Sequence, residues 1–243
     1  AADYFSCLAY LHRSRCAFQT ILRDQRPPSS NLVAERALLE WGETDTASLA
    51  TYLQWRKLFY DLDNRAAQVI ALALERVIAR ALGGRSFSAT ELGNPVAGRQ
   101  IDCWLASLSS AYEIKLRVTE AMSGKGRLGA EMRFPQEVAA AGHTPVLAVL
   151  DDTPAKHLDK MTAAYIQAGG SVHLGKDAWR HFENTAPAAT WMFLTKYVYT
   201  PMRTIAATSP PGQSLRSLNL SADTQGRSTV APDGTPSFLL GWT

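Results

Sequence analysis

The chain has 243 residues with 46% hydrophobic side chains, which is enough to bury a substantial core. It contains no run of 18 apolar residues, so the sequence predicts no membrane-spanning helix. Three scattered cysteines form neither a disulfide framework nor a Cys-x-x-Cys zinc site, and the first residues lack the features of a signal peptide. We therefore expect a cytoplasmic protein, whose formal net charge of +3 is mildly favourable for binding nucleic acid.

The first third of the chain predicts helices. The last of them has the clearest apolar face and ends at Gly83-Gly84, because glycine readily adopts the backbone conformation that closes a helix. The helix before it is rich in aromatic side chains. The expected helices cover residues 9–22, 32–41, 48–62 and 64–82.

Two strands that follow carry the most informative charges of the chain. Asp102 lies on the first strand, and side chains of the second, residues 112–118, alternate between two faces. Glu113, Lys115 and Arg117 share one face, and three charges there are costly to bury unless they are paired or bound. The opposite, apolar face is formed by Tyr112, Ile114, Leu116 and Val118.

If the two strands are neighbours, two carboxylates and one ammonium group meet at one point. Carboxylates suit Mg²⁺, which proteins usually hold by one or two carboxylates together with substrate phosphates. A lysine beside them suits contact with a phosphate and orientation of a water molecule. These residues therefore indicate hydrolysis of phosphodiester bonds.

The elements after this motif complete an α/β pattern. A helix follows the second strand, and residues 144–150 predict an apolar strand. Residues 200–243 are rich in Pro, Gly, Ser and Thr with little periodicity, which predicts loops. Between them we expect a strand over residues 171–174 and helices over residues 176–183 and 190–199.

With Asp102 followed after ten residues by Glu113-Ile114-Lys115, the chain resembles the PD-(D/E)xK nuclease superfamily. Ile101 stands where the superfamily often has proline. The compact format most resembles a type II restriction endonuclease. The resemblance implies an α/β restriction-endonuclease-like core, a central mixed sheet flanked by helices, within a single nuclease domain. Its expected parts are a helical N-terminal region (residues 1–63), a catalytic core (64–185) and a C-terminal helix with loops (186–243).

The resemblance also implies roles for these residues. Asp102 and Glu113 would bind Mg²⁺ together with the backbone carbonyl of Ile114, and Lys115 would place or activate the attacking water. A homodimer would cut double-stranded DNA at a specific sequence and leave 5′-phosphate and 3′-hydroxyl ends. Glu75, on the polar face of the preceding helix, is a candidate additional acid, and the alternative is a solvent-facing glutamate.

Candidate DNA contacts follow the catalytic strand. Lys125 and Arg127 lie in a glycine-rich segment whose N–H groups can approach phosphate, and Arg133 and Gln136 lie on the helix after it. The alternatives are a flexible basic loop and the exposed face of an amphipathic helix.

Three other functions stay open. The first is a repair or junction nuclease of the same superfamily, and the second is a DNA-binding module without catalysis. The third is a dinucleotide-binding oxidoreductase, because residues 124–129 match Gly-x-Gly-x-x-Gly and Asp151 follows at a suitable distance. The charged preceding strand, the five residues between it and the first glycine, and Pro135 in the following helix disfavour this third interpretation.

Overall fold

The structure, a computed structural model, describes residues 1–25, 42, 45–118, 127–208, 218–222, 224, 228–232 and 238–239. By their contacts the residues form two compact units, Ala1–Leu11 with Ala71–Thr208, and His12–Ile70 with Ser209–Thr243. The residues of the candidate site belong to the first unit. The single nuclease domain over residues 1–243 stays a prediction. No helix in the described part of the chain is long and apolar enough to cross a membrane.

Two long helices dominate the N-terminal part. α1 spans Ala2–Arg23 and α3 spans Thr46–Ala81. The expected separation of helices over residues 48–62 and 64–82 is wrong, because no glycine or proline interrupts the sequence there and α3 is continuous. Its predicted end is confirmed, since Gly83 follows with a φ of +79°. The helix expected over residues 32–41 lies outside the described residues.

A five-stranded mixed sheet forms the centre of the first unit, in the order β1-β2-β3-β4-β5. β1, β2 and β3 are antiparallel neighbours, whereas β3, β4 and β5 run parallel. The predicted α/β class with a mixed sheet flanked by helices is therefore confirmed. The strands span Arg85–Phe87, Ile101–Leu105, Ser110–Lys115, Thr144–Val149 and Ser171–Leu174.

Two details of the sheet differ from the expectation. β1 was not predicted, because three residues are too few to show a period. β3 ends at Lys115, and the side chain of Val118 is buried on the opposite side from those of Tyr112 and Ile114. The predicted apolar face thus holds within the strand and is wrong for Val118, because alternation stops where the strand stops.

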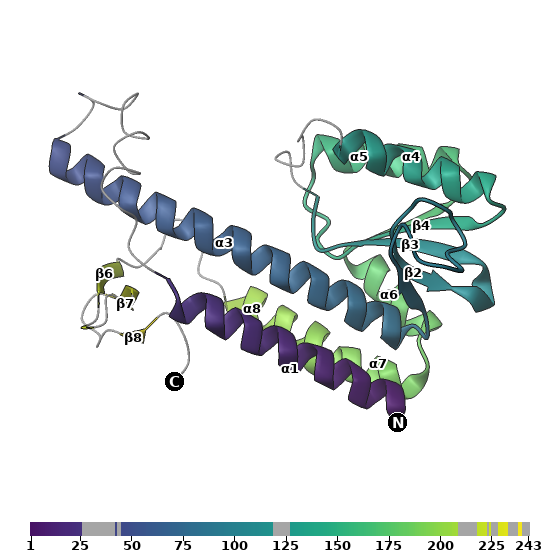
Figure 1. The fold of residues 1–243 in the computed structure, drawn as a ribbon, viewed down its shortest axis with the longest axis horizontal. Helices are drawn as coiled ribbons and strands as arrows, with labels where there is room; N and C mark the ends of the chain where they lie inside the picture. The colour runs from purple at the N-terminus through teal and green to yellow at the C-terminus, as the bar shows by residue number, and fades with distance from the viewer. Residues whose placement is uncertain are drawn as a thin grey trace. The chain divides into compact units, whose positions relative to one another are not determined.

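Helices cover both faces of the sheet (Figure 1). α4 (Arg127–Ala140) and α5 (Lys156–Gln167) lie on one face, and α6 (Lys176–Thr185) lies on the other. α5 was not predicted, although its buried side chains recur at helical spacing. α7 (Ala188–Leu194) continues through a π-helical turn, Thr195–Tyr199, into α8 (Thr200–Thr208).

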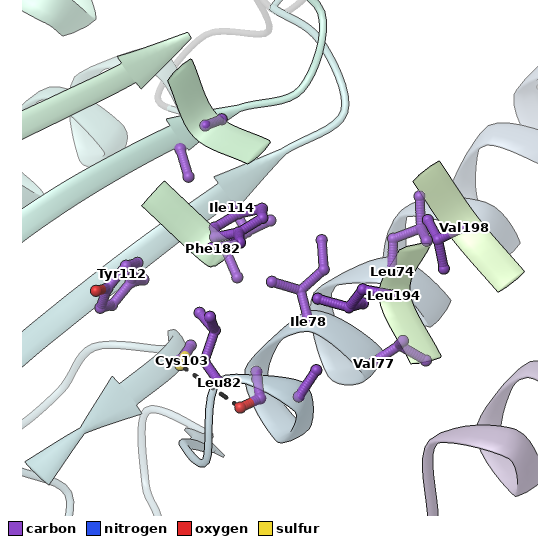
Figure 2. Close-up of a cluster of buried hydrophobic side chains, with 14 of the residues drawn as sticks. Leu74, Val77, Ile78, Leu82, Cys103, Tyr112, Ile114, Phe182, Leu194 and Val198 are labelled. Carbon is purple, nitrogen blue, oxygen red and sulfur yellow. Dashed lines mark hydrogen bonds between the residues drawn. The ribbon is translucent and has the colours of Figure 1, made fainter. Parts of the chain in front are cut away.

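The core has two parts, one on each face of the sheet. On the α6 face, side chains of β2 and β3 pack against the end of α3 and against α6 and α7 (Figure 2). On the α4 and α5 face, Leu147 and Val149 of β4 pack against Phe134, Met161 and Tyr165. β3 lies between these two cores, so its side chains alternate into both.

The C-terminal region contains more structure than the predicted loops. α8 extends to Thr208, and a separate antiparallel sheet has the order β6-β7-β8. The prediction of loops is wrong for these elements, because short strands give little periodicity to detect. The strands span Leu218–Ala222, Ser228–Pro232 and Phe238–Leu239.

Candidate active site

Asp102 is fixed between the two antiparallel strands. Its side chain is buried in β2, with 6% of the residue exposed, and its Oδ2 accepts a hydrogen bond from the N–H of Ile114 at 2.9 Å. Ile114 is the middle residue of Glu113-Ile114-Lys115. The structure therefore brings the aspartate and the Glu-x-Lys segment together, as the spacing predicted.

Glu113 and Lys115 point away from the apolar side of β3. Their side chains are 14% and 13% exposed, and the Lys115 ammonium contacts the Glu113 carboxylate directly. Arg117, expected on the same face, lies beyond the end of the strand and is exposed. The charged face of β3 is thus a close pair of opposite charges.

Glu131 of α4 joins this pair, although the sequence analysis gave it no role. Its Oε1 lies 3.4 Å from Lys115 Nζ, and its side chain is only 10% exposed. Lys115 is therefore held between carboxylates from a strand and from the helix that covers it. Glu131 is the first acidic residue in the helix after the Glu-x-Lys segment. This position could have indicated from the sequence that Glu131 lies near the site.

The electrostatics of the cluster favour added positive charge. Burial and then the carboxylates of Glu113 and Glu75 raise the pKa of Asp102 well above its usual value, against the opposing effects of the Ile114 N–H and Lys115. Burial lowers the pKa of Lys115, but Glu113 and Glu131 outweigh it and raise that pKa overall. Lys115 therefore stays an ammonium ion, while Asp102 lacks a full counter-charge.

Glu75 lies within electrostatic reach of the site. It is half-buried on α3, and its charge is one cause of the raised pKa of Asp102. The role of Glu75 as an additional acid stays a prediction, as does the alternative of a solvent-facing glutamate.

Tyr165 of α5 lies within electrostatic reach of the site. The residue is fully buried, and the described part of the chain supplies no hydrogen-bond partner for its hydroxyl group. Its pKa is raised by burial and then by the charges of Glu113, Asp102 and Glu131. An unsatisfied buried hydroxyl group is costly, so Tyr165 is a polar group that the apolar core alone does not explain.

The predicted DNA contacts are placed only in part. Lys125 lies outside the described residues, and so does the side chain of Arg127, the first residue of α4. Arg133 and Gln136 are exposed on α4. α4 itself is anchored by Glu137, which accepts a hydrogen bond of 2.6 Å from Arg99 in the segment that leads into β2.

Carboxylate oxygens are the hard ligands that the candidate site offers to a cation. No group of three or more His, Cys, Asp or Glu side chains within the described residues is arranged to hold a metal ion. Mg²⁺ needs only one or two carboxylates, because water and phosphate oxygens complete its shell. Burial and then the neighbouring carboxylates raise the pKa of Asp102, so added positive charge there would favour its ionised form.

Comparison with known proteins identifies the kinship of the chain. The sequence profile of the ApaLI-like restriction endonucleases matches residues 1–199, which include every residue of the cluster. The chain belongs to this family. Its relatives include the type II restriction enzyme ApaLI of Acetobacter pasteurianus, 40% identical over 213 residues, or 84% of this chain and 57% of that protein. The chain thus spans 57% of the length of the curated relative it matches. No solved structure matches.

Membership of the ApaLI-like family confirms the predicted kinship with type II restriction endonucleases. It also decides against the dinucleotide-binding interpretation of residues 124–129. Pro135, however, does not disfavour that interpretation as expected, because α4 runs through it rather than stopping there. Asp151 accepts hydrogen bonds from the N–H and hydroxyl of Thr153, so it caps a turn after β4.

Proposed function

We propose that the chain is a Mg²⁺-dependent, sequence-specific endonuclease that hydrolyses phosphodiester bonds of double-stranded DNA. The observation that carries the proposal is the hydrogen bond from Ile114 to buried Asp102, which joins the aspartate to the Glu-x-Lys segment. Family membership and the relative's name support the same activity.

The carboxylates of Asp102 and Glu113, with the backbone carbonyl of Ile114, would hold the cation. A bound Mg²⁺ would lower the pKa of a water molecule and offset negative charge on the phosphate. The hydrogen bond from Ile114 restricts Asp102 to one orientation, so the donor set is prearranged. Glu75 would act as the additional acid and strengthen the negative field at Asp102.

Lys115 would orient the attacking water and stabilise charge on the phosphate. Its contacts with Glu113 and Glu131 restrict the positions that the ammonium group can take. Catalysis needs this restriction, because a misplaced group loses most of its catalytic effect. Attack of water on phosphorus with departure of the 3′ oxygen leaves a 5′-phosphate and a 3′-hydroxyl. The chain's residues thus supply the donor set and the positioned ammonium group.

The proposed partners are DNA and a second copy of the chain. Lys125, Arg127, Arg133 and Gln136 would contact DNA, with the arginines and the lysine on phosphates. A homodimer would match a palindromic site, because a two-fold protein presents the same surface to each half-site. Light scattering after size-exclusion chromatography, with and without duplex DNA, measures the subunit number.

The test is digestion of long duplex DNA by the purified protein with Mg²⁺ or with EDTA. Wild-type protein should give discrete fragments only with Mg²⁺, and a Lys115→Ala variant should give none. A Lys160→Ala variant removes an exposed lysine of α5 and should cut like wild type. Duplex DNA that stays intact with wild-type protein under every condition would refute the proposal.

A further inference from the structure

A polar pocket of about 350 Å³ lies between α1, the end of α3 and β1. Three guanidinium groups and three hydroxyl groups line it, and none of the lining residues carries a carboxylate. Such a lining suits an anion and disfavours an apolar ligand. The polar lining residues are Ser6, Tyr10, Arg76, Arg80, Arg85 and Ser86.

The arginines lie on helix α3 and strand β1 rather than on loops. Arg76 and Arg80 are four residues apart on α3 and therefore share one face of the helix. Gly84 brings Arg85 close to that face. A Cβ on Gly84 would lie 2.4 Å from Cys103 Sγ and 2.9 Å from the Trp104 carbonyl oxygen, so only glycine permits this approach of β1 to β2.

The charges of the pocket are available to a ligand. Arg80 pairs with Asp3 at 2.8 Å and Arg85 pairs with Glu91, but both pairs are exposed and such pairs are weak. Arg76 is exposed and makes no ion pair with any residue that the structure describes. A phosphate group can therefore bind Arg76 directly and compete for the other guanidinium groups.

The pocket adjoins the candidate active site through two elements. Ser86, which lines the pocket, donates a hydrogen bond of 2.7 Å from its hydroxyl to the backbone carbonyl of Asp102. Arg76 directly follows Glu75, the acid whose charge reaches Asp102. A polymer bound with one phosphate at Asp102 would have other phosphates nearby.

We propose that this pocket binds a phosphate of the DNA backbone other than the one that is hydrolysed. The assignment rests on the proposed endonuclease function. Contacts of guanidinium groups with backbone phosphate fix the position of the duplex and are independent of its sequence. The pocket would thus hold the strand in register with Asp102, Glu113 and Lys115.

The test measures binding of a fluorescent duplex over a range of salt concentrations, in EDTA so that no cleavage occurs. Arg76→Ala should weaken binding equally for duplexes of different sequence and lower the slope of log K against log salt by about one. Arg76→Lys should keep most of that slope. Arg180→Ala, at an exposed arginine of α6, is the matched control and should bind like wild type.

Three results would overturn the assignment alone, and a fourth would refute the function on which it rests. Equal slopes for wild type and Arg76→Ala, in protein that still cuts DNA, would refute the pocket alone. An equal loss for Arg180→Ala would show a general charge effect. If inorganic phosphate raises the melting temperature of wild type but not of Arg76→Ala, while DNA binding is unchanged, the pocket binds free phosphate. Wild-type protein that neither binds nor cuts DNA would refute the endonuclease function itself.

Discussion

The two faces of β3 differ in chemistry although they belong to one strand. On one face Tyr112 and Ile114 lie in an apolar core with α3, α6 and α7 (Figure 2). On the other face Glu113 and Lys115 meet Glu131 beneath α4. Burial of apolar groups stabilises the fold, whereas burial of carboxylates beside Asp102 opposes it. The comparison teaches that the apolar face stabilises the strand, whereas the charged face, where we propose the catalytic site, opposes stability.

The apolar face should carry the larger share of stability. Phe182→Ala removes a fully buried ring of α6 and should lower the free energy of unfolding by about 3–5 kcal/mol. Cleavage per folded molecule should stay near wild type at low temperature, because the ring lies in the core with Tyr112 and Ile114 rather than on the face of Glu113 and Lys115. Urea unfolding and digestion at low temperature measure the two effects. A Phe182→Ala variant with the same free energy of unfolding as wild type would contradict the proposal that the apolar face carries the larger share of stability.

The charged face should show the reverse pattern. Asp102→Asn keeps an acceptor for the Ile114 N–H but removes the charge, so cleavage should fall by at least about a hundredfold. Stability at neutral pH should stay equal or rise, because the pKa of Asp102 is raised in the folded protein and ionisation there is unfavourable. The contribution of Asp102 to the free energy of unfolding should fall as the pH rises above the pKa that this aspartate has in the unfolded chain. The Asp102→Asn variant should not show this fall. Reduced stability in the variant would contradict the electrostatic account.

Glu131 sharpens the comparison, because it reaches the site from a helix rather than from the sheet. Glu131→Gln should slow cleavage by about tenfold, the lower end of the effect of groups that orient a reactive centre. The pH profile of cleavage should also change, since Lys115 loses one of its two carboxylates. Glu183→Gln, at an exposed position of α6, is the control and should leave both rate and profile unchanged. An unchanged pH profile for Glu131→Gln would limit Glu131 to a packing role.

The smallest expected effect on stability comes from His181, which lies next to Tyr112 of the apolar face and stacks on His173. The ring of His181 stacks on that of His173 at 3.9 Å and shares a hydrogen bond of 2.9 Å with the Tyr112 hydroxyl group. Burial and then His173 lower the pKa of His181 to about 4. The unfolded chain therefore binds more protons between about pH 4 and 6.5, so stability should rise with pH across that window. Urea unfolding from pH 4 to 7 should show a shallower rise for His181→Gln, and an equal rise would refute this assignment.

The parts of the fold that could be predicted are those with a strong local pattern. β4, β5 and α6 follow apolar runs or a clear amphipathic period, and their expected bounds lie close to those in the structure. β1 could not be predicted, because its pairing with β2 depends on tertiary contacts of three residues. The continuity of α3 was missed because polar residues near its middle resemble a break, although none of them is glycine or proline.

The residues of the candidate site also divide into those that the sequence could predict and those that it could not. Asp102, Glu113 and Lys115 could be found from spacing, because they lie on two strands joined by a short connection. Glu131 lies 16 residues after Lys115, and Tyr165 comes from a later helix. Only the packing of α4 and α5 over the sheet brings these two side chains to the motif. Residues contributed by a covering layer leave no fixed spacing in the sequence.

The central claim is that the charged face of β3 with Asp102 binds a divalent cation. Calorimetric titration with Ca²⁺ in place of Mg²⁺ measures this binding without cleavage, in wild type and in Asp102→Asn. The account predicts binding by wild type and its loss in the variant, while Glu183→Gln binds like wild type. Equal binding by wild type and Asp102→Asn would contradict it.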